Sequence, residues 1–245
     1  MSAPPDRRTF AVSDDRRAVL RPIVERFGLD PDRVNWERLN RAFLHRSHRT
    51  EANLDEDNER LEFLGDSVIG LACTEYLLRE NPASDEGGLS KVRAALVSRA
   101  ILGRVGEDLG LGGLLLLGTG EDRSGGRQRA STLGSTLEAV CGAFHLDFPW
   151  EELRQVIWRV VIVPALAHNE GAVLVDHKSA LQEHVQAELQ RAPEYRVVGE
   201  TGPDHAKIFH VEVAIDGRVL GRGEGPRKQV AENEAARDAL KKLKG

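Results

Sequence analysis

The ten residues at positions 58–67 read NERLEFLGDS, and they carry three of the carboxylates on which the interpretation of this chain depends. Glu59, Glu62 and Asp66 are spaced i, i+3 and i+7, and such positions share one face of an α-helix. Like charges at this spacing repel, so a helix gains no stability from them. Hard oxygen ligands gathered against repulsion are what Mg²⁺ or Mn²⁺ requires. The spacing therefore admits a site for a divalent cation.

A second predicted helix offers another carboxylate, Glu138, whose neighbours Leu137, Ala139 and Val140 are apolar. This setting predicts a glutamate that enters a partly buried site. From spacing alone, however, a solvated acidic face paired with cations such as Arg60 is favoured over a metal site, because ordinary ion-pair networks have the same pattern. Residue spacing by itself leaves both interpretations open.

The length of 245 residues predicts one large domain or two small ones. Because 40% of the residues are hydrophobic and 30% are charged, a buried core is expected and wholesale disorder is not. The formal net charge is −5. Charge alone therefore predicts no nucleic-acid partner, and a patch that binds nucleic acid would have to be local.

The two cysteines, Cys73 and Cys141, lie far apart in the sequence. This spacing excludes a disulfide framework and a CxxC zinc site, and it fits a reducing compartment. No apolar run is long enough to span a bilayer, and the first ten residues lack the apolar core of a signal peptide. We expect a cytoplasmic protein with no membrane partner.

The spacing of apolar residues changes along the chain and predicts two folded parts. Up to about residue 168, apolar residues recur three and four positions apart, as in helices. The predicted helices cover 14–28, 36–47, 57–79, 89–109, 130–147 and 151–167. The polar, glycine-rich stretch 118–129 is predicted to be an exposed loop. We expect a disordered tail over residues 1–13, a helical domain over 14–168, a linker over 169–175 and a second domain over 176–245.

The second predicted domain has the element order α-β-β-β-α. Asp176 is a favourable N-cap for a helix that runs to about Gln190. Strands are predicted at 195–200 and 209–215, and the Asp216-Gly217 pair that follows is a strong signal for a tight hairpin into a third strand. The last predicted helix begins near Arg227.

Several stretches of the chain resemble motifs of one enzyme family. NERLEFLGDS resembles the signature decapeptide of the ribonuclease III family almost letter for letter. In family order, residues 42–47 resemble its ALTHRS element, 85–91 its DEGxLSK stretch, and 117–131 its LGxGE…GGRxRxS loop. Residues 176–183 and 223–232 resemble parts of a double-stranded-RNA-binding domain. The resemblance implies an α+β chain, in which an all-α ribonuclease III endonuclease domain precedes a small α-β-β-β-α double-stranded-RNA-binding domain.

The resemblance implies a homodimer that hydrolyses double-stranded RNA with Mg²⁺, or alternatively Mn²⁺, and leaves 5′-phosphates and short 3′ overhangs. Ribosomal and other RNA precursors, including messenger RNA, are the substrates that the family implies. On matching positions, Asp66 and Glu138 would be catalytic, and Glu62 would join them as metal ligands. Glu59 and Glu86 match the remaining acidic positions of the catalytic valley.

The resemblance also assigns residues to RNA binding in the C-terminal domain. Gln182 and Gln186, one turn apart on its first helix, can reach the 2′-hydroxyl groups of a minor groove, and His205 could do so from the loop between the first two strands. Arg227 and Lys228 precede the last helix, whose N-terminal end also favours phosphate.

Phe63 lies between two candidate ligands on the predicted helix. Core packing is the ordinary role for such a residue, but the resemblance implies that this aromatic ring contacts its counterpart across the axis of the homodimer. A two-fold dimer would provide two active sites, one for each strand of an RNA duplex.

One position departs from the family pattern. The pattern around the last glutamate is ADTxEA, whereas residues 134–139 of this chain read GSTLEA, so that Ser135 replaces an acidic residue. A hydroxyl is a weak and neutral ligand, which makes Ser135 a doubtful metal ligand and predicts a weaker affinity for the metal. The alternative function is therefore a double-stranded-RNA-binding protein with weak or no cleavage.

A carboxylate-bridged di-iron protein is a third class to consider. Such a protein requires Glu-x-x-His ligand pairs from facing helices. No pair of this kind lies beside Glu59, Glu62 or Glu138. The di-iron interpretation is therefore ranked far below the other two.

Overall fold

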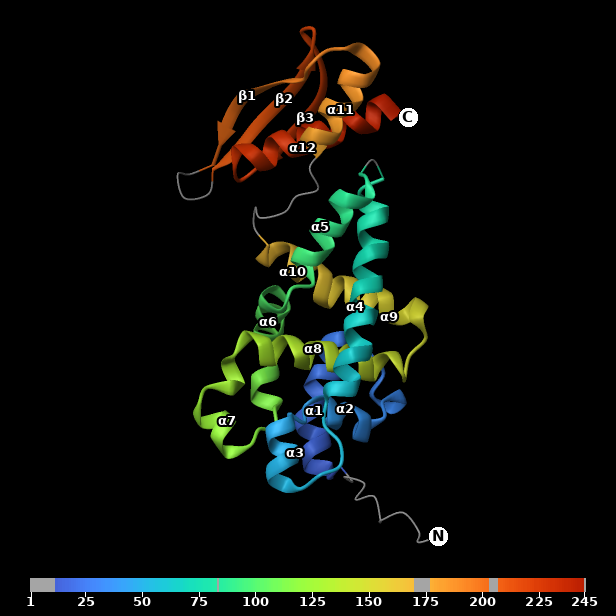
Figure 1. The fold of residues 1–245 in the computed structure, drawn as a ribbon, viewed down its shortest axis with the longest axis vertical. Helices are drawn as coiled ribbons and strands as arrows, with labels where there is room; N and C mark the ends of the chain where they lie inside the picture. The colour runs from blue at the N-terminus through green and yellow to red at the C-terminus, as the bar shows by residue number, and fades with distance from the viewer. Residues whose placement is uncertain (1–11, 83, 170–176, 203–206, 245) are drawn as a thin grey trace. The chain divides into compact units, whose positions relative to one another are not determined.

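The structure is a computed structural model that describes residues 12–82, 84–169, 177–202 and 207–244. Within these ranges the chain forms two compact units (Figure 1). The first unit contains the chain up to Tyr76 and from Ala94 to Asn169, and the second contains Leu77–Arg93 and the chain from His177 onward. No helix among the described residues is long and apolar enough to cross a membrane.

The first unit is helical. Its first helix, α1 (Asp14–Phe27), begins where the Ser13 side chain accepts a hydrogen bond from the backbone N–H of Arg16, and it ends at Gly28 with a positive φ of 67°. The other α-helices that lie wholly or partly in this unit are α2 (Trp36–Ala42), α3 (Arg46–Ala52), α4 (Glu59–Glu80), α5 (Glu86–Leu96), α6 (Arg99–Asp108), α7 (Thr119–Arg123), α8 (Ala130–His145), α9 (Trp150–Ile157) and α10 (Val163–His168). Short 3₁₀ or π turns are η1 (Pro31–Arg33), η2 (Leu111–Leu114), η3 (Gly126–Gln128) and η4 (Trp158–Ile162).

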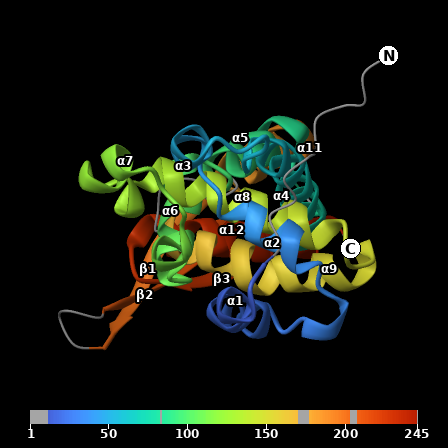
Figure 2. The ribbon, with the colours of Figure 1, turned by 90° about the horizontal axis from the view of Figure 1, so that it is seen from below.

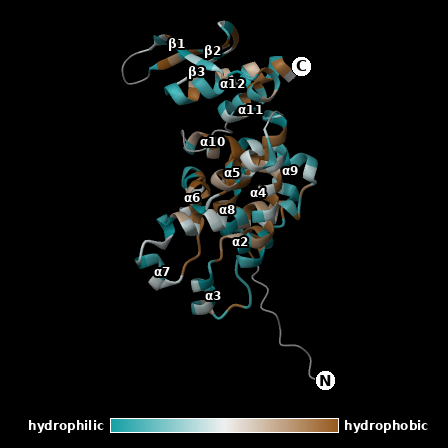
Figure 3. Cartoon of the chain, turned by 45° about the horizontal axis from the view of Figure 1, so that its top comes forward, coloured by the Kyte–Doolittle hydropathy of each residue, from teal (hydrophilic) through white to brown (hydrophobic). Residues whose placement is uncertain are grey.

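Helix α8 forms the centre of the first unit. It is buried almost continuously from Thr132 to Phe144, including Leu137 and Phe144, which have no exposed surface. Figure 3 shows the difference in hydropathy between α8, which carries many hydrophobic residues, and the hydrophilic α7. Helix α4 crosses α8 near the middle of the unit (Figures 1 and 2). The core therefore fixes α8 and holds α4 against it.

Three sequence expectations differ from the structure. The helix predicted over 36–47 is two helices, because the backbone at His45 bonds to the carbonyl oxygen of Leu116 and the His45 side chain caps α3. The helix predicted over 89–109 is also two, with Ser98 as the N-cap of α6. The loop expectation for 118–129 is wrong in part, because this stretch contains α7 and η3. Arg127 orders it by donating hydrogen bonds to the carbonyl oxygens of Gly112 and Leu115.

The second unit contains α11 (His177–Leu189), a three-stranded antiparallel sheet and α12 (Lys228–Lys244). The sheet has the order β1 (Glu194–Thr201), β2 (Ile208–Ile215) and β3 (Arg218–Gly225). The predicted tight turn is present, with Asp216 and Gly217 both at positive φ, 48° and 78°. The expected α-β-β-β-α order is thus confirmed.

The core of the second unit lies between the sheet and its two helices. Alternate residues of β2, including Val211 and Val213, point toward α11 and α12, where they meet Leu181, Val185 and Leu240. The expected N-cap Asp176, the linker 169–175 apart from Asn169, and nearly all of the tail 1–13 lie outside the described residues. The predicted domain boundaries stay predictions.

Candidate active site

The crossing of α4 and α8 brings the predicted metal ligands to one place. A Cβ atom at Gly65 of α4 would lie 1.7 Å from the carbonyl oxygen of Glu138, and one at Gly142 of α8 would lie 2.3 Å from the carbonyl oxygen of Leu61. The two backbones can approach this closely only because both residues are glycines. Gly65 is preceded by Glu62 within one turn and followed directly by Asp66, so both carboxylates are positioned beside Glu138.

Glu138 is the buried member of this cluster, with 6% of its surface exposed. Burial raises the pKa of its carboxyl group to about 7, and the negative charges of Glu62 and Asp66 contribute to this rise, whereas Arg99 acts in the opposite direction. Glu62 and Asp66 therefore both lie close enough to Glu138 for their negative charges to repel its carboxylate. Their repulsion is the electrostatic condition that a divalent cation relieves.

Ser135 lies in the same cluster, one turn before Glu138 on α8. Its hydroxyl donates a hydrogen bond of 2.8 Å to Oε1 of Glu62. This residue therefore orients a carboxylate by hydrogen bonding, where the family pattern has a carboxylate of its own. The structure places the departure noted in the sequence inside the cluster.

Two family models match the chain. The model described as "Ribonuclease-III-like" matches residues 35–165, and the model "Double-stranded RNA binding motif" matches residues 177–243. The chain belongs to the ribonuclease III family. It is 46% identical over 227 residues to Ribonuclease 3 of Leifsonia xyli subsp. xyli, covering 92% of each chain, and 44% identical over 228 residues to Ribonuclease 3 of Thermobifida fusca, covering 93% of each chain.

A solved structure gives the same assignment for the helical part. The nuclease domain of ribonuclease III from Campylobacter jejuni is 32% identical and superposes with a TM-score of 0.54, covering 58% of this chain and 95% of that one. The Campylobacter nuclease domain shows structural flexibility in a region involved in its dimer formation. Together the relatives and the two domain models identify this ribonuclease III chain as an endoribonuclease that acts on double-stranded RNA.

The donor set of the cluster fits the divalent metal on which the ribonuclease III family depends. In the orientations they adopt, no group of three His, Cys, Asp or Glu side chains among the described residues is arranged to hold a metal ion. The cluster nevertheless supplies three oxygen ligands of the kind that Mg²⁺ prefers, and Glu138 is buried at a raised pKa. Rotation of Glu62 away from Ser135 would free its Oε1 for coordination.

The other two acidic positions are placed differently. Glu59 is the first residue of α4 and is exposed, and its backbone N–H bonds to Oδ1 of Asp57. Glu86 begins α5 in the second compact unit, where it accepts a hydrogen bond of 2.9 Å from the Ser90 hydroxyl. The structure thus brings together Glu62, Asp66, Glu138 and Ser135, and the valley role of Glu59 and Glu86 stays a prediction.

Phe63 is the most exposed of the large hydrophobic residues that the structure describes, with 80% of its surface accessible. It lies between Glu62 and Gly65 on α4 but points away from the core of its own chain. An exposed phenylalanine at this position is compatible with a contact to a second copy, and it excludes the alternative of core packing.

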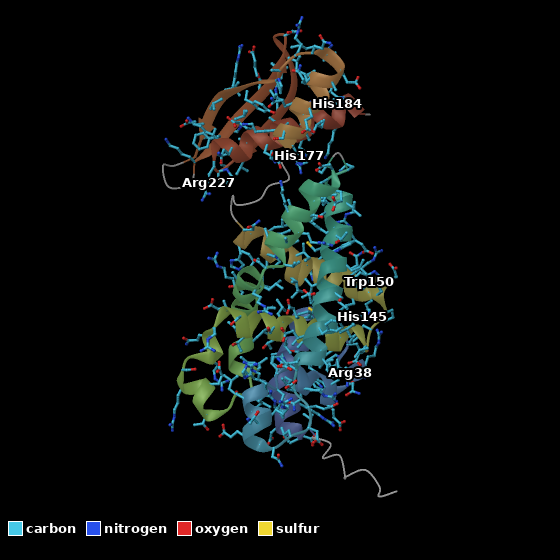
Figure 4. The ribbon with its side chains drawn as sticks, in the orientation of Figure 1. Arg38, His145, Trp150, His177, His184 and Arg227 are labelled. Atoms are coloured by element: carbon cyan, nitrogen blue, oxygen red, sulfur yellow. The ribbon has the colours of Figure 1, made fainter. Side chains whose placement is uncertain are left out.

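The RNA-binding candidates of the second unit are exposed where the structure describes them. Gln182 and Gln186 line one open face of α11. Arg227 precedes α12 (Figure 4), and Lys228 is the first residue of that helix, with its ammonium group 5.7 Å from the centre of the Phe209 ring. His205 lies outside the described residues.

Sequence reasoning missed one charged residue of the site, Arg99. It is the first residue of α6, and its positive charge acts on Glu138. No spacing rule connects positions 99 and 138, because the connection arises from the packing of α6 on α8. Proximity to a buried carboxylate, which only the folded chain shows, is the signal that identifies it.

Proposed function

We propose that this chain cleaves double-stranded RNA with Mg²⁺ held by Glu62, Asp66 and Glu138, with Asp66 and Glu138 as the catalytic pair. The observation that carries the proposal is the close approach of Gly65 to the Glu138 backbone, which brings the stretches of α4 and α8 that carry these carboxylates together. The Glu138 carboxylate is only 6% exposed and is repelled by two other carboxylates, so its charged form is costly in free energy. A bound cation would offset this cost.

The residues divide the work of the reaction. A bound Mg²⁺ supplies Lewis-acid stabilisation of the phosphate and an activated water. Glu138 gives a buried charge of fixed position, which the packed α8 backbone holds in place. Ser135 holds Glu62 through a hydrogen bond to Oε1, which coordination of a metal by Oε1 would replace. Preorganised charge of this type lowers the barrier without reorganisation during the reaction.

We propose that the second unit holds the duplex and that a homodimer supplies the second active site. Gln182 and Gln186 would contact 2′-hydroxyl groups, and Arg227 and Lys228 would contact phosphates. His205 would add a contact from the loop between β1 and β2. Phe63 would lie on the dimer axis, and the products would carry 5′-phosphates and short 3′ overhangs. Precursors of ribosomal and messenger RNA are the proposed substrates.

Incubation of a long RNA duplex with the purified chain across a Mg²⁺ titration tests this function on a denaturing gel. We expect cleavage that requires metal and that is lost in Glu138→Gln. Glu151→Gln, which removes an exposed carboxylate of α9, is the matched control and should cut as the parent does. An intact duplex that is nevertheless shifted on a native gel would contradict cleavage and support the RNA-binding alternative.

A further inference from the structure

Among the residues that the structure describes, Arg99 is the one cation whose charge is seen to act on Glu138. Arg99 begins α6, its side chain is exposed, and its charge lowers the pKa of Glu138 against the effects of burial, Glu62 and Asp66. The proposed metal ligands account for the negative charges of this cluster. The proposed metal ligands do not account for the positive charge of Arg99.

The packing of α6 on α8 fixes this charge at the site. A Cβ atom at Gly134 would lie 3.1 Å from the carbonyl oxygen of Arg99, and one at Gly103 would lie 2.4 Å from the carbonyl oxygen of Ala130. Gly134 directly precedes Ser135 and lies one turn before Glu138. The backbone of Arg99 therefore contacts the same turn of α8 that carries the cluster.

Three other arginines of the first unit have structural partners. Arg127 binds Asp122 and two carbonyl oxygens, Arg129 binds Glu121, and Arg49 binds Asp57. Arg99, in contrast, forms no ion pair within 4.0 Å and no side-chain hydrogen bond to any residue that the structure describes. Its charge acts on Glu138 without a direct contact, and its exposed side chain is available to a ligand.

We propose that Arg99 binds a non-bridging oxygen of the RNA phosphate that enters the carboxylate cluster. This inference rests on the proposed function, because the phosphate is the one to be cleaved. Three carboxylates repel a phosphate, and a guanidinium group beside them provides a fixed donor that matches phosphate geometry.

The proposal predicts effects of opposite sign on the two ligands of the site. Removal of the Arg99 charge weakens the binding of RNA, because a phosphate contact is lost. The same removal strengthens the binding of a divalent cation, because a repelling positive charge is gone. A purely structural role for Arg99 would instead weaken both or leave both unchanged.

The test uses Arg99→Gln and Arg99→Lys in the full chain, with Arg104→Gln as the matched control. Arg104 is an exposed arginine of the same helix that bonds only to the carbonyl oxygen of His168, so its removal changes the net charge equally. Duplex affinity is measured against salt concentration in the Glu138→Gln background, where the RNA stays intact. Mn²⁺ affinity is measured by electron paramagnetic resonance without RNA and with Glu138 restored, and thermal melting checks the fold.

A plot of log affinity against log salt concentration has a negative slope. We expect the magnitude of this slope to be smaller by about 1 for Arg99→Gln than for Arg104→Gln, as for one lost phosphate contact. We also expect tighter Mn²⁺ binding and an unchanged melting temperature, and Arg99→Lys should retain the slope. Equal slopes for the two glutamine variants, or weaker Mn²⁺ binding in Arg99→Gln, would overturn the proposal even if the parent chain cleaves RNA. Failure of the parent to cleave would instead refute the proposed function.

Discussion

Ser135 has a hydroxyl that forms a hydrogen bond where the family pattern has a charged carboxylate. Two substitutions of similar size separate the effect of charge at this position from the effect of side-chain volume. Ser135→Asp adds a carboxylate beside Glu62 and should lower the Mg²⁺ concentration needed for half-maximal stabilisation. Ser135→Asn adds similar volume without charge and should not. The measurement is thermal melting across a Mg²⁺ titration, followed by cleavage of duplex RNA. Equal metal dependence in the two variants would show that position 135 does not face the metal.

The raised pKa of Glu138 predicts a specific pH dependence of stability in the absence of metal. Its folded pKa of about 7 exceeds the ordinary value of 4.5, so between these pH values the folded state binds more protons than the unfolded state. The contribution of this group to the free energy of unfolding therefore falls as pH rises through that window, by about 3 kcal/mol in total.

Melting of the chain and of Glu138→Gln in a chelator, from pH 4.5 to pH 8, measures this effect. The variant should gain stability over the parent as pH rises, because its neutral amide avoids the repulsion. Addition of Mg²⁺ should flatten the profile of the parent. Parallel profiles for the two proteins in chelator would contradict the assignment of the repulsion to Glu138.

The acidic residues proposed for the site could be predicted from sequence, whereas the positively charged Arg99 could not. Glu62, Asp66 and Glu138 match motif positions of the ribonuclease III family, and this resemblance indicates metal chemistry where spacing alone favoured a solvated acidic face. Arg99 lies outside every motif used in the prediction, and its relation to Glu138 depends on the packing of α6. The spacing of residues in the sequence indicates which side chains are neighbours within one helix or strand. Contacts between helices or strands can be identified only from the folded structure.

At the scale of elements, the site depends on how closely α4 and α8 approach. Gly65→Ala would place a methyl group against the Glu138 carbonyl oxygen, which is backbone and cannot rotate away. We expect a loss of about 3 kcal/mol in the free energy of unfolding, at the upper end of overpacking costs, together with weaker metal binding.

Gly70→Ala is the matched control for this prediction. It is also a glycine within α4, but a Cβ atom there meets no atom within 4 Å. Its replacement should stabilise the chain by up to about 1 kcal/mol, since alanine favours helix more than glycine does. Urea unfolding of both variants measures the difference. A Gly65→Ala variant as stable as Gly70→Ala would show that the helices do not require contact at this point.

The elements themselves were predicted in type more reliably than in extent. Apolar periodicity located the helices of the first unit, and the strand pattern with Asp216-Gly217 located the hairpin. The periodicity did not show the breaks at His45 and Ser98, because apolar spacing continues through each of them. It also missed the order in 118–129, which depends on hydrogen bonds from Arg127 to distant carbonyl oxygens.

At the scale of the whole molecule, the region that matches the ribonuclease-III-like model, residues 35–165, precedes the region that matches the double-stranded RNA binding motif, residues 177–243. The α-β-β-β-α order of the second unit followed from sequence, since local patterns determine it. The outward position of Phe63 is not indicated by the residue pattern, which ordinarily assigns such a phenylalanine to the core, but it agrees with the dimer contact that the family resemblance implies. The proposed contact with a second chain would explain an apolar side chain that is exposed in one chain.

Phe63→Ala tests this explanation in the complete protein. If two symmetric copies of Phe63 contribute to one interface, each loses about 2 kcal/mol of burial energy on truncation. Sedimentation equilibrium should then show a marked shift from dimer to monomer. Leu146→Ala, which truncates a residue that is 53% exposed on the same unit, is the control and should leave the equilibrium unchanged.

The RNA products connect the oligomeric state to the function. A monomer retains its own carboxylate cluster and its second unit, so the Phe63→Ala variant should still shift a duplex on a native gel. It lacks the second active site that a dimer supplies, and cuts in the two strands should become uncoupled, so that nicked duplex accumulates in place of paired ends. A variant that is monomeric yet still cuts both strands together would show that one chain reaches both strands, and the dimer would then serve another purpose.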